Sequence, residues 1–140
     1  MKKTAVIYWS GTGNTEAMAN AVAEGMKEAG AEVTVMTADQ VDANALSYSA
    51  IAFGCPAMGS EVLEEVDFQL MFDGCKNRLG GTSVALFGSY GWGDGEWMRS
   101  WEKDCSDAGV NLVCESVTCC EAPDDAALAA CRELGKALAK

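Results

Sequence analysis

The sequence predicts an α/β fold, a doubly wound parallel sheet with helices on both faces. The runs at 4–9 and 50–55 are continuously apolar and rich in strand formers, and the run at 82–90 begins in the same way. Strands that are apolar on both faces belong to a parallel sheet covered by helices on each side. Helical patterns alternate with these runs, so we expect a βαβαβαβαβα order with ligands beyond the carboxyl ends of the strands.

The remaining elements follow from the periodicity of the apolar residues. Residues 32–36 and 110–117 supply two more strands, and the second alternates enough to indicate a more exposed position. Apolar residues three and four apart predict a helix over 15–29, ended by Gly30, and another over 124–140, preceded by Pro123. We expect shorter helices over 62–75 and 96–108 and a single helical turn within 41–47.

Composition limits the possible functions. A chain of 140 residues, 49% hydrophobic and 22% charged, is expected to form one globular domain over residues 1–140. Its formal net charge of −11 repels phosphate backbones, so we expect no nucleic-acid partner, and it favours partners with basic surfaces. No apolar run is long enough for a membrane span and the N-terminus does not form a signal peptide, so we expect a cytoplasmic protein. The absence of histidine excludes sites that need an imidazole.

Seven cysteines raise the question of a metal site. They are an odd number and include no C-x-x-C pair, so we expect free and mostly buried thiols. A four-cysteine iron or zinc site drawn from positions 105–131 is the alternative. The adjacent Cys119 and Cys120 are expected to have no redox role. The cysteines are Cys55, Cys75, Cys105, Cys114, Cys119, Cys120 and Cys131.

The loop WSGTGNT at 9–15 follows the first strand and opens the first helix. Gly11 and Gly13 free backbone N–H groups at the positive end of this helix, and hydroxyl groups lie nearby. The loop lacks the lysine of the G-x-x-x-x-G-K-[ST] motif and the third glycine of G-x-G-x-x-G. A terminal monophosphate fits best, and the alternative is a capped turn that binds no ligand.

Two further loops follow the third and fourth strands. Met58 offers a polarizable contact to an aromatic ring, and Gly59 permits unusual peptide orientations. Glu61 can accept a hydrogen bond from a ring imide, and Trp92 can stack on a planar ligand, with Tyr90 as the alternative. Trp97 and Trp101 lie four residues apart on the following helix and are expected to be core. Together the three loops predict a site for a phosphorylated planar ring, and flavin mononucleotide (FMN) fits that description.

The same loops resemble those of the flavodoxin family, in particular its short-chain bacterial members. The similar stretches are YWSGTGNTE at 8–16, AMGSEVLEE at 57–65 and GSYGWGDGEWM at 88–98. The resemblance spans essentially the whole chain. It implies a flavodoxin-like five-stranded parallel sheet in the order 2-1-3-4-5 and FMN as the cofactor.

The resemblance also implies a role for each loop. Residues 10–15 correspond to the phosphate-binding loop, Met58 to the inner ring contact and Trp92 to the outer one. The Gly59 carbonyl is expected to turn toward flavin N5 in the neutral semiquinone, and Glu61 to accept from flavin N3. Pro56 and Ser60 depart from residues found in some relatives. The predicted cofactor-binding residues are Ser10, Gly11, Thr12, Gly13, Asn14, Thr15, Pro56, Ala57, Met58, Gly59, Glu61, Ser89, Tyr90, Gly91, Trp92 and Gly93.

The expected function is that of a low-potential one-electron carrier without its own substrate, used in place of ferredoxin. Negative surroundings disfavour the extra charge of a fully reduced flavin. We expect a monomer that docks redox proteins with basic surfaces, of the pyruvate oxidoreductase, ferredoxin/flavodoxin reductase or hydrogenase type. A flavin enzyme such as a quinone reductase, a non-redox binding module and a cysteine-ligated metal protein are the alternatives. The acidic residues expected at the docking surface are Glu61, Glu64, Glu65, Asp67, Asp94 and Glu96.

Overall fold

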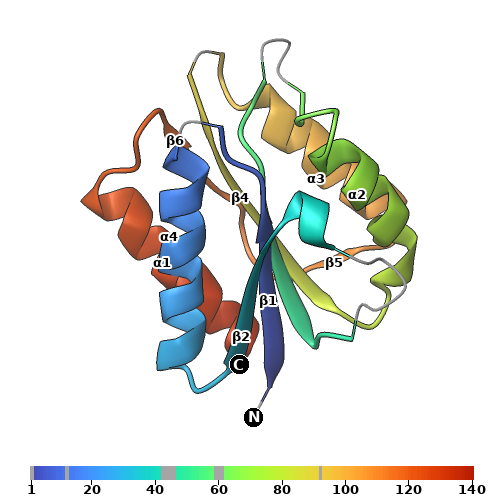
Figure 1. Ribbon diagram of the computed structural model, residues 1–140, viewed down its shortest axis with the longest axis vertical. Coiled ribbons are helices and arrows are strands. Elements are labelled where there is room, and N and C mark those ends of the chain that lie inside the picture. Colours follow the sequence, from blue (N-terminus) through green and yellow to red (C-terminus); the bar gives the residue numbers. More distant parts are fainter. Residues whose placement is uncertain (1, 12, 42–46, 59–61, 92) are drawn as a thin grey trace.

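A central parallel sheet lies between two layers of helices in the computed structural model, which describes residues 2–11, 13–41, 47–58, 62–91 and 93–140. Helices α1 (Asn14–Glu28) and α4 (Asp125–Ala139) cover one face, and α2 (Phe68–Cys75) and α3 (Glu96–Asp107) cover the other (Figure 1). Two 3-10 turns, Ala38–Gln40 and Lys76–Arg78, follow β2 and α2. The predicted doubly wound architecture is therefore confirmed.

The strands pair in the order β2-β1-β3-β4-β5, and a further strand, β6, also pairs with β4. All pairs are parallel. The predicted 2-1-3-4-5 order is thus confirmed. The strands are β1 (Lys3–Tyr8), β2 (Glu32–Thr37), β3 (Ala50–Gly54), β4 (Ser83–Tyr90), β5 (Asn111–Leu112) and β6 (Val117–Cys120).

The continuous apolar runs of the central strands fill two cores at once. In β1, Ile7 packs toward α2 and α3, whereas Val6 packs toward α1 and α4. In β3, Phe53 and Ala52 divide between the two cores in the same way. Successive side chains of a strand point to opposite faces, so a strand covered on both sides needs apolar residues at every position.

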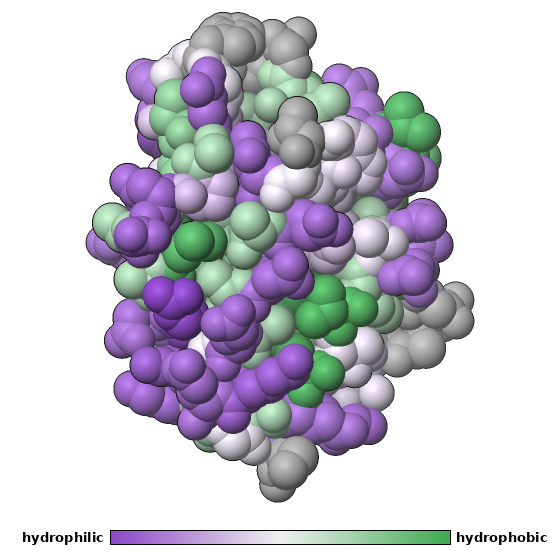
Figure 2. All heavy atoms as spheres, turned by 60° about the vertical axis from the view of Figure 1, so that its left-hand side comes forward, coloured by the Kyte–Doolittle hydropathy of each residue, from purple (hydrophilic) through white to green (hydrophobic). Residues whose placement is uncertain are grey.

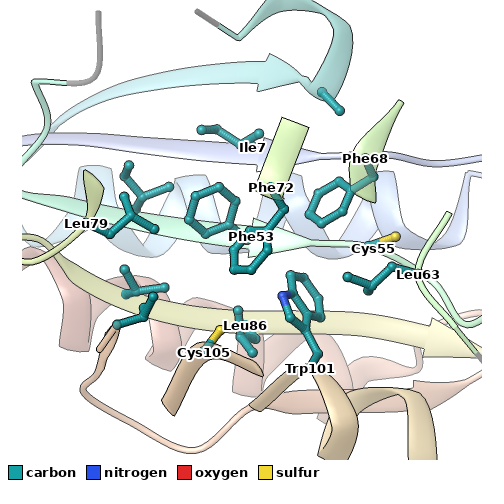
Figure 3. Packing of buried hydrophobic residues seen from close by; sticks show 14 of the residues in the cluster. Ile7, Phe53, Cys55, Leu63, Phe68, Phe72, Leu79, Leu86, Trp101 and Cys105 are labelled. Carbon is teal, nitrogen blue, oxygen red and sulfur yellow. The ribbon is translucent and has the colours of Figure 1, made fainter. Parts of the chain in front are cut away.

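Aromatic rings dominate the core under α2 and α3. Phe53 of β3 meets the ring of Phe72 edge to face with centroids 5.2 Å apart, and Trp101 of α3 meets Phe68 in the same geometry at 5.3 Å. Figure 3 shows these four side chains converging between the sheet and the two helices. Trp97 and Trp101 are 1% and 2% exposed, so the prediction that both are core residues is confirmed.

The last predicted strand is wrong in its details. Residues 110–117 do not form one strand, because β5 ends at Leu112 and pairing with β4 resumes only at Val117. Between these two pairings β4 runs only from Val84 to Phe87, whereas its partner segment runs from Leu112 to Val117. The partner segment therefore contains two extra residues, which loop out of the sheet. The Ser116 hydroxyl in this loop donates to the Glu102 carboxylate of α3 at 2.7 Å.

The helix predicted over 62–75 begins only at Phe68. The segment before it is held by the carboxylate of Glu64, which accepts hydrogen bonds from the backbone N–H groups of Val66, Asp67 and Phe68 at 2.8–2.9 Å. If the helix began one turn earlier, backbone carbonyls of that turn would accept hydrogen bonds from these N–H groups, and the Glu64 carboxylate takes their place. Of the turn predicted within 41–47, residues 42–46 lie outside the described part of the chain.

Hydrophilic side chains cover much of the face formed by α1 and α4, with apolar ones scattered among them (Figure 2). Within the described residues, no helix combines the length and apolar character that crossing a bilayer requires.

Candidate functional site

A cavity of about 460 Å³ opens at the carboxyl ends of the central strands. It is lined by the loops after β1, β3 and β4, which end at the top of the sheet in Figure 1, opposite both termini. Its volume falls within the range usual for small-molecule sites. The lining residues are Trp9, Gly11, Asn14, Pro56, Ala57, Met58, Ser89, Tyr90, Gly91 and Glu121.

The loop after β1 leads directly into α1. Gly13 occupies the N-cap position with φ of 95°, in the left-handed region that only glycine adopts readily, and no side-chain cap is made there. The Ser10 hydroxyl accepts a hydrogen bond from the Gly13 N–H at 3.0 Å and closes the loop. The N–H groups of the first helical turn lack helical partners, so the loop presents donors with a favourable helix dipole.

The loop also contacts the neighbouring strand. The hydroxyl oxygens of Thr15 and Ser89 lie 3.4 Å apart, and both residues are buried. This contact joins the start of α1 to the end of β4, where Ser89 lines the cavity.

The loop after β3 is bonded to the end of β4 and to itself beside the cavity. The Ala57 N–H donates to the Ser89 carbonyl at 3.0 Å, and the Met58 N–H donates to the Val62 carbonyl at 2.9 Å. The Tyr90 ring lies 5.4 Å from that of Trp97, which anchors it to α3. Trp97 is itself fixed, because its indole N–H donates to the Cys55 carbonyl at 3.1 Å. The cavity walls are thus held by the protein's own contacts.

Eight of the sixteen predicted cofactor-binding residues line the cavity. They come from all three predicted loops and are Gly11, Asn14, Pro56, Ala57, Met58, Ser89, Tyr90 and Gly91. Ser10, Gly13, Thr15 and Gly93 are not among its lining residues. Thr12, Gly59, Glu61 and Trp92 lie outside the described residues.

Two lining residues were not predicted. Trp9 follows the last residue of β1, and its indole ring lies so close to Gly11 that a Cβ at position 11 would sit 3.0 Å from it. Its place between an apolar strand and a glycine-rich loop was a usable signal. Glu121 adopts a φ of 58° after β6, and its N–H donates to the Tyr90 carbonyl at 2.7 Å. Glu121 could not be predicted from the residues around it, because its position depends on where β6 ends.

The acidic surface differs from the prediction at one of the described residues, Glu64. Glu64 is only 6% exposed, and its carboxylate is used within the chain, so it is not a surface charge. Burial raises the pKa of this carboxyl, but hydrogen bonds from Phe68, Asp67 and Val66 outweigh that effect and leave the pKa below its usual value. Asp94 is exposed, as predicted, and its carboxylate is paired with Arg99 at 2.9 Å. Glu65, Asp67 and Glu96 are exposed, as predicted, and Glu61 lies outside the described residues.

The cysteines form no metal site within the described chain. Four are buried, and burial raises the pKa of the thiols of Cys55, Cys105 and Cys131 to about 12. Cys119 and Cys120 are neighbours on β6, and Cys119 is the less exposed of the two. Adjacent residues of a strand point to opposite faces, so these thiols do not face each other.

The chemistry of the cavity suits a ligand with an anionic end and a planar apolar body. Backbone donors and the start of α1 lie near Gly11 and Asn14, whereas Ala57, Met58 and Tyr90 supply apolar and aromatic surface. The described lining residues include no lysine or arginine, so the anionic end is matched to hydrogen-bond donors and the helix dipole. A monophosphate joined to an aromatic ring system meets both conditions.

Comparison with known proteins decides the family. The sequence matches the family model described as flavodoxin over residues 6–135. The chain belongs to the flavodoxin family. It is 44% identical to the flavodoxin of Megasphaera elsdenii, over 96% of this chain and 97% of the relative, and 42% identical to that of Clostridium beijerinckii with the same coverage.

Similarity to solved structures supports the same family as the sequence comparisons. The solution structure of two-electron reduced Megasphaera elsdenii flavodoxin superposes with a TM-score of 0.88 at 43% identity, covering 97% of this chain and 98% of that one. As a flavodoxin, the chain is an electron-transfer protein that uses FMN, and it does not turn over a substrate of its own. Its partners are redox proteins.

Proposed function

We propose that this flavodoxin is a low-potential one-electron carrier that holds FMN non-covalently in the cavity described above. The observation that carries the proposal is the meeting of three loops at one cavity, whose lining includes Asn14 at the start of α1, which has no side-chain cap, together with Met58 and Tyr90. When bound, FMN supplies the redox chemistry by accepting and releasing electrons.

The phosphate would be held by the loop from Ser10 to Thr15. Gly11 and Asn14 line the cavity, and the Ser10 hydroxyl already orders the backbone at Gly13. Phosphate oxygens accept hydrogen bonds from the free N–H groups of a first helical turn, and the helix dipole stabilises their charge. This arrangement supports binding without a basic side chain.

The ring would lie against the loops after β3 and β4. Pro56, Ala57, Met58, Ser89, Tyr90 and Gly91 line that part of the cavity. On the resemblance to relatives, Gly59, Glu61, Trp92 and Gly93 are further contacts of the ring in this proposal. The hydrogen bond from the Met58 N–H to Val62 and the packing of Tyr90 on Trp97 support a preformed wall.

The low potential would come from negative charge around the site. The net charge is −11, and the described lining residues include Glu121 but no lysine or arginine. Negative charge weakens the binding of whichever redox state carries the extra charge, and each tenfold change in affinity shifts a one-electron potential by about 59 mV.

The proposed setting is a monomeric, single-domain protein of the cytoplasm, with residues 1–140 forming the FMN-binding domain, that replaces ferredoxin. Its partners would present basic surfaces to the exposed carboxylates of Glu65, Asp67 and Glu96. Enzymes of the pyruvate oxidoreductase, ferredoxin/flavodoxin reductase and hydrogenase types are the proposed donors and acceptors.

An anaerobic potentiometric titration of the FMN-loaded protein tests this function. We expect two separate one-electron couples, each with a Nernst slope of about 59 mV, and no oxidation of NAD(P)H with a quinone as acceptor. A single two-electron couple with a slope of about 30 mV, or steady NAD(P)H–quinone turnover, would show that the one-electron carrier assignment is wrong.

A further inference from the structure

The two glycines of the loop after β1 meet different constraints. Gly13 has a φ of 95°, and a Cβ at this position would meet no atom within 4 Å, so its backbone conformation favours glycine. The φ of Gly11 lies outside the left-handed region, but a Cβ there would sit 3.0 Å from Cη2 and 3.2 Å from Cζ3 of Trp9. Carbon atoms that are not bonded normally approach to about 3.5–4.0 Å. Glycine at position 11 therefore leaves space for the indole ring of Trp9.

The sheet holds Trp9 in place. Its N–H donates to the Gly54 carbonyl at 3.0 Å, just beyond the last residue pair of β1 and β3, which is Tyr8 with Gly54. Tyr8 packs in the core under α1 and α4, whereas Trp9 packs against the core under α2 and α3, as the alternation of side chains along a strand requires. The base of the ring that touches Gly11 is thus fixed by the sheet and the core.

The loop that the ring touches crosses to the opposite side of the sheet. After this loop the chain enters α1, which covers the other face (Figure 1). Within the loop the Ser10 hydroxyl accepts a hydrogen bond from the Gly13 N–H at 3.0 Å. Trp9, Gly11 and Asn14 all line the cavity. The contact of Trp9 with Gly11 therefore supports the loop at the cavity wall, from the side of the sheet that α2 and α3 cover.

The size of the indole ring decides whether this contact exists. Cη2 and Cζ3 belong to the six-membered part of the ring, at its far end from the main chain. Trp9→Phe shortens the side chain, which would no longer reach Gly11, but it keeps an apolar ring against the core. A loop that is held in its binding conformation before the ligand arrives loses less entropy on binding. Shortening the ring thus removes the support of the loop and leaves the wall apolar.

We propose that Trp9 is a positioning residue for phosphate binding. Its ring fixes the backbone at Gly11, so that the N–H groups and hydroxyls of residues 10–15 are arranged for the phosphate of FMN before FMN binds. The inference rests on the proposed function, in which this loop holds the phosphate, and adds a residue that acts through the loop. Because its action is confined to the phosphate end, loss of the ring weakens the binding of FMN but not that of riboflavin, which has no phosphate.

The dissociation constants of the apoprotein for FMN and for riboflavin test this role. We expect Trp9→Phe to raise the constant for FMN about threefold to tenfold, as when binding has to order a loop, and to change that for riboflavin by less than about twofold. Tyr90→Leu is the comparison, because Tyr90 also lines the cavity with a ring but packs on Trp97. We expect it to weaken both ligands to a similar extent. If Trp9→Phe weakens both ligands equally, or neither, the proposal is overturned.

Gly11→Ala tests the same contact from the other side. The added methyl group competes with the ring for space, so we expect weaker binding of FMN and unchanged binding of riboflavin. In the Trp9→Phe background that space is free, and Gly11→Ala should cost less affinity than it does alone. Gly80→Ala is the control, because a Cβ at Gly80 meets no atom within 4 Å, and it should bind FMN as the wild type does. Additive losses from Trp9→Phe and Gly11→Ala would show that the two residues act independently and would overturn the proposal.

Failure of the proposed function gives a different result. If the wild-type protein bound FMN and riboflavin equally, the phosphate site in the first loop, and the role of Trp9 with it, would be wrong. A wild type that prefers FMN, together with the same preference in Trp9→Phe, overturns only the role of Trp9.

Discussion

Gly135 of α4 lies directly against the main-chain carbonyl of Val22 in α1, and a methyl group at position 135 would overlap that oxygen. Gly25 of α1 meets the carbonyl of Arg132 in the same way. The backbones of the two helices are therefore in direct contact. The two helices cover one face of the sheet, and the loop after β1 leads into α1 (Figure 1).

Replacing Gly135 by alanine tests this close approach. Alanine normally stabilises a helix by about 1 kcal/mol relative to glycine. The overlap here is with backbone, which cannot rotate away, so we expect a net loss of about 1–3 kcal/mol in the free energy of unfolding. Urea denaturation measures it, with Gly80→Ala as the control, because a Cβ at Gly80 meets no atom within 4 Å. Equal stabilities for the two variants would rule out this packing.

Glu64 predicts a defined pH dependence. Its folded pKa lies below the ordinary value of 4.5, so its stabilising contribution is complete above that value and is lost as the pH falls through the folded pKa. We expect Glu64→Gln to cost about 1–3 kcal/mol at pH 7, because backbone donors lose a charged acceptor. The deficit should shrink at acid pH in urea titrations. A deficit that is constant with pH, or one matched by the exposed neighbour variant Glu65→Gln, would contradict this role.

Two buried tryptophans make a second contrast. The Trp97 indole N–H donates to the Cys55 carbonyl, whereas that of Trp101 has no hydrogen-bond acceptor within the described chain. Both Trp→Phe changes lose packing, but only Trp97→Phe leaves a buried carbonyl without this donor. We expect Trp97→Phe to be the more destabilising by about 1 kcal/mol or more. Because Trp97 supports Tyr90, only this variant should also weaken FMN binding. Chemical denaturation and FMN titration check both points, and an equal loss for the two variants would refute the contrast.

The Glu121 carboxylate should influence the redox potentials. Glu121 is one of the residues that line the cavity, but it is exposed, so the field of its carboxylate is largely screened. We expect Glu121→Gln to raise the more negative one-electron potential by less than about 59 mV, which corresponds to less than a tenfold change in relative affinity. Potentiometry in low salt measures the shift, and a lowered potential would contradict the proposed electrostatic effect.

The sequence was sufficient for the parallel sheet and its helices because the apolar periods of strands and helices are local. The order of the strands came from the resemblance of the three loops to a known family. The interruption between Leu112 and Val117 was not predictable in the same way. The alternation of apolar residues along a segment is the same for one continuous strand and for two strands separated by two looped-out residues.

Half of the predicted cofactor residues line the cavity because glycine-rich loops after parallel strands converge at one edge of the sheet. Contacts set by tertiary packing were missed. Glu64 looked like one more surface acid, and only its position beside the turn before α2 makes it an internal acceptor. Glu121 joins the cavity lining because its N–H donates to the Tyr90 carbonyl, a contact between segments distant in the chain.

In the proposed function the first loop holds a phosphate through N–H groups, hydroxyls and the start of α1, without a basic side chain. Comparing the dissociation constants of the apoprotein for FMN and for riboflavin, which lacks the phosphate, tests it most directly. Several charge-assisted hydrogen bonds of about 1.5 kcal/mol or more each predict that FMN binds at least about 100-fold more tightly. Equal affinities for FMN and riboflavin would show that this loop does not hold the phosphate.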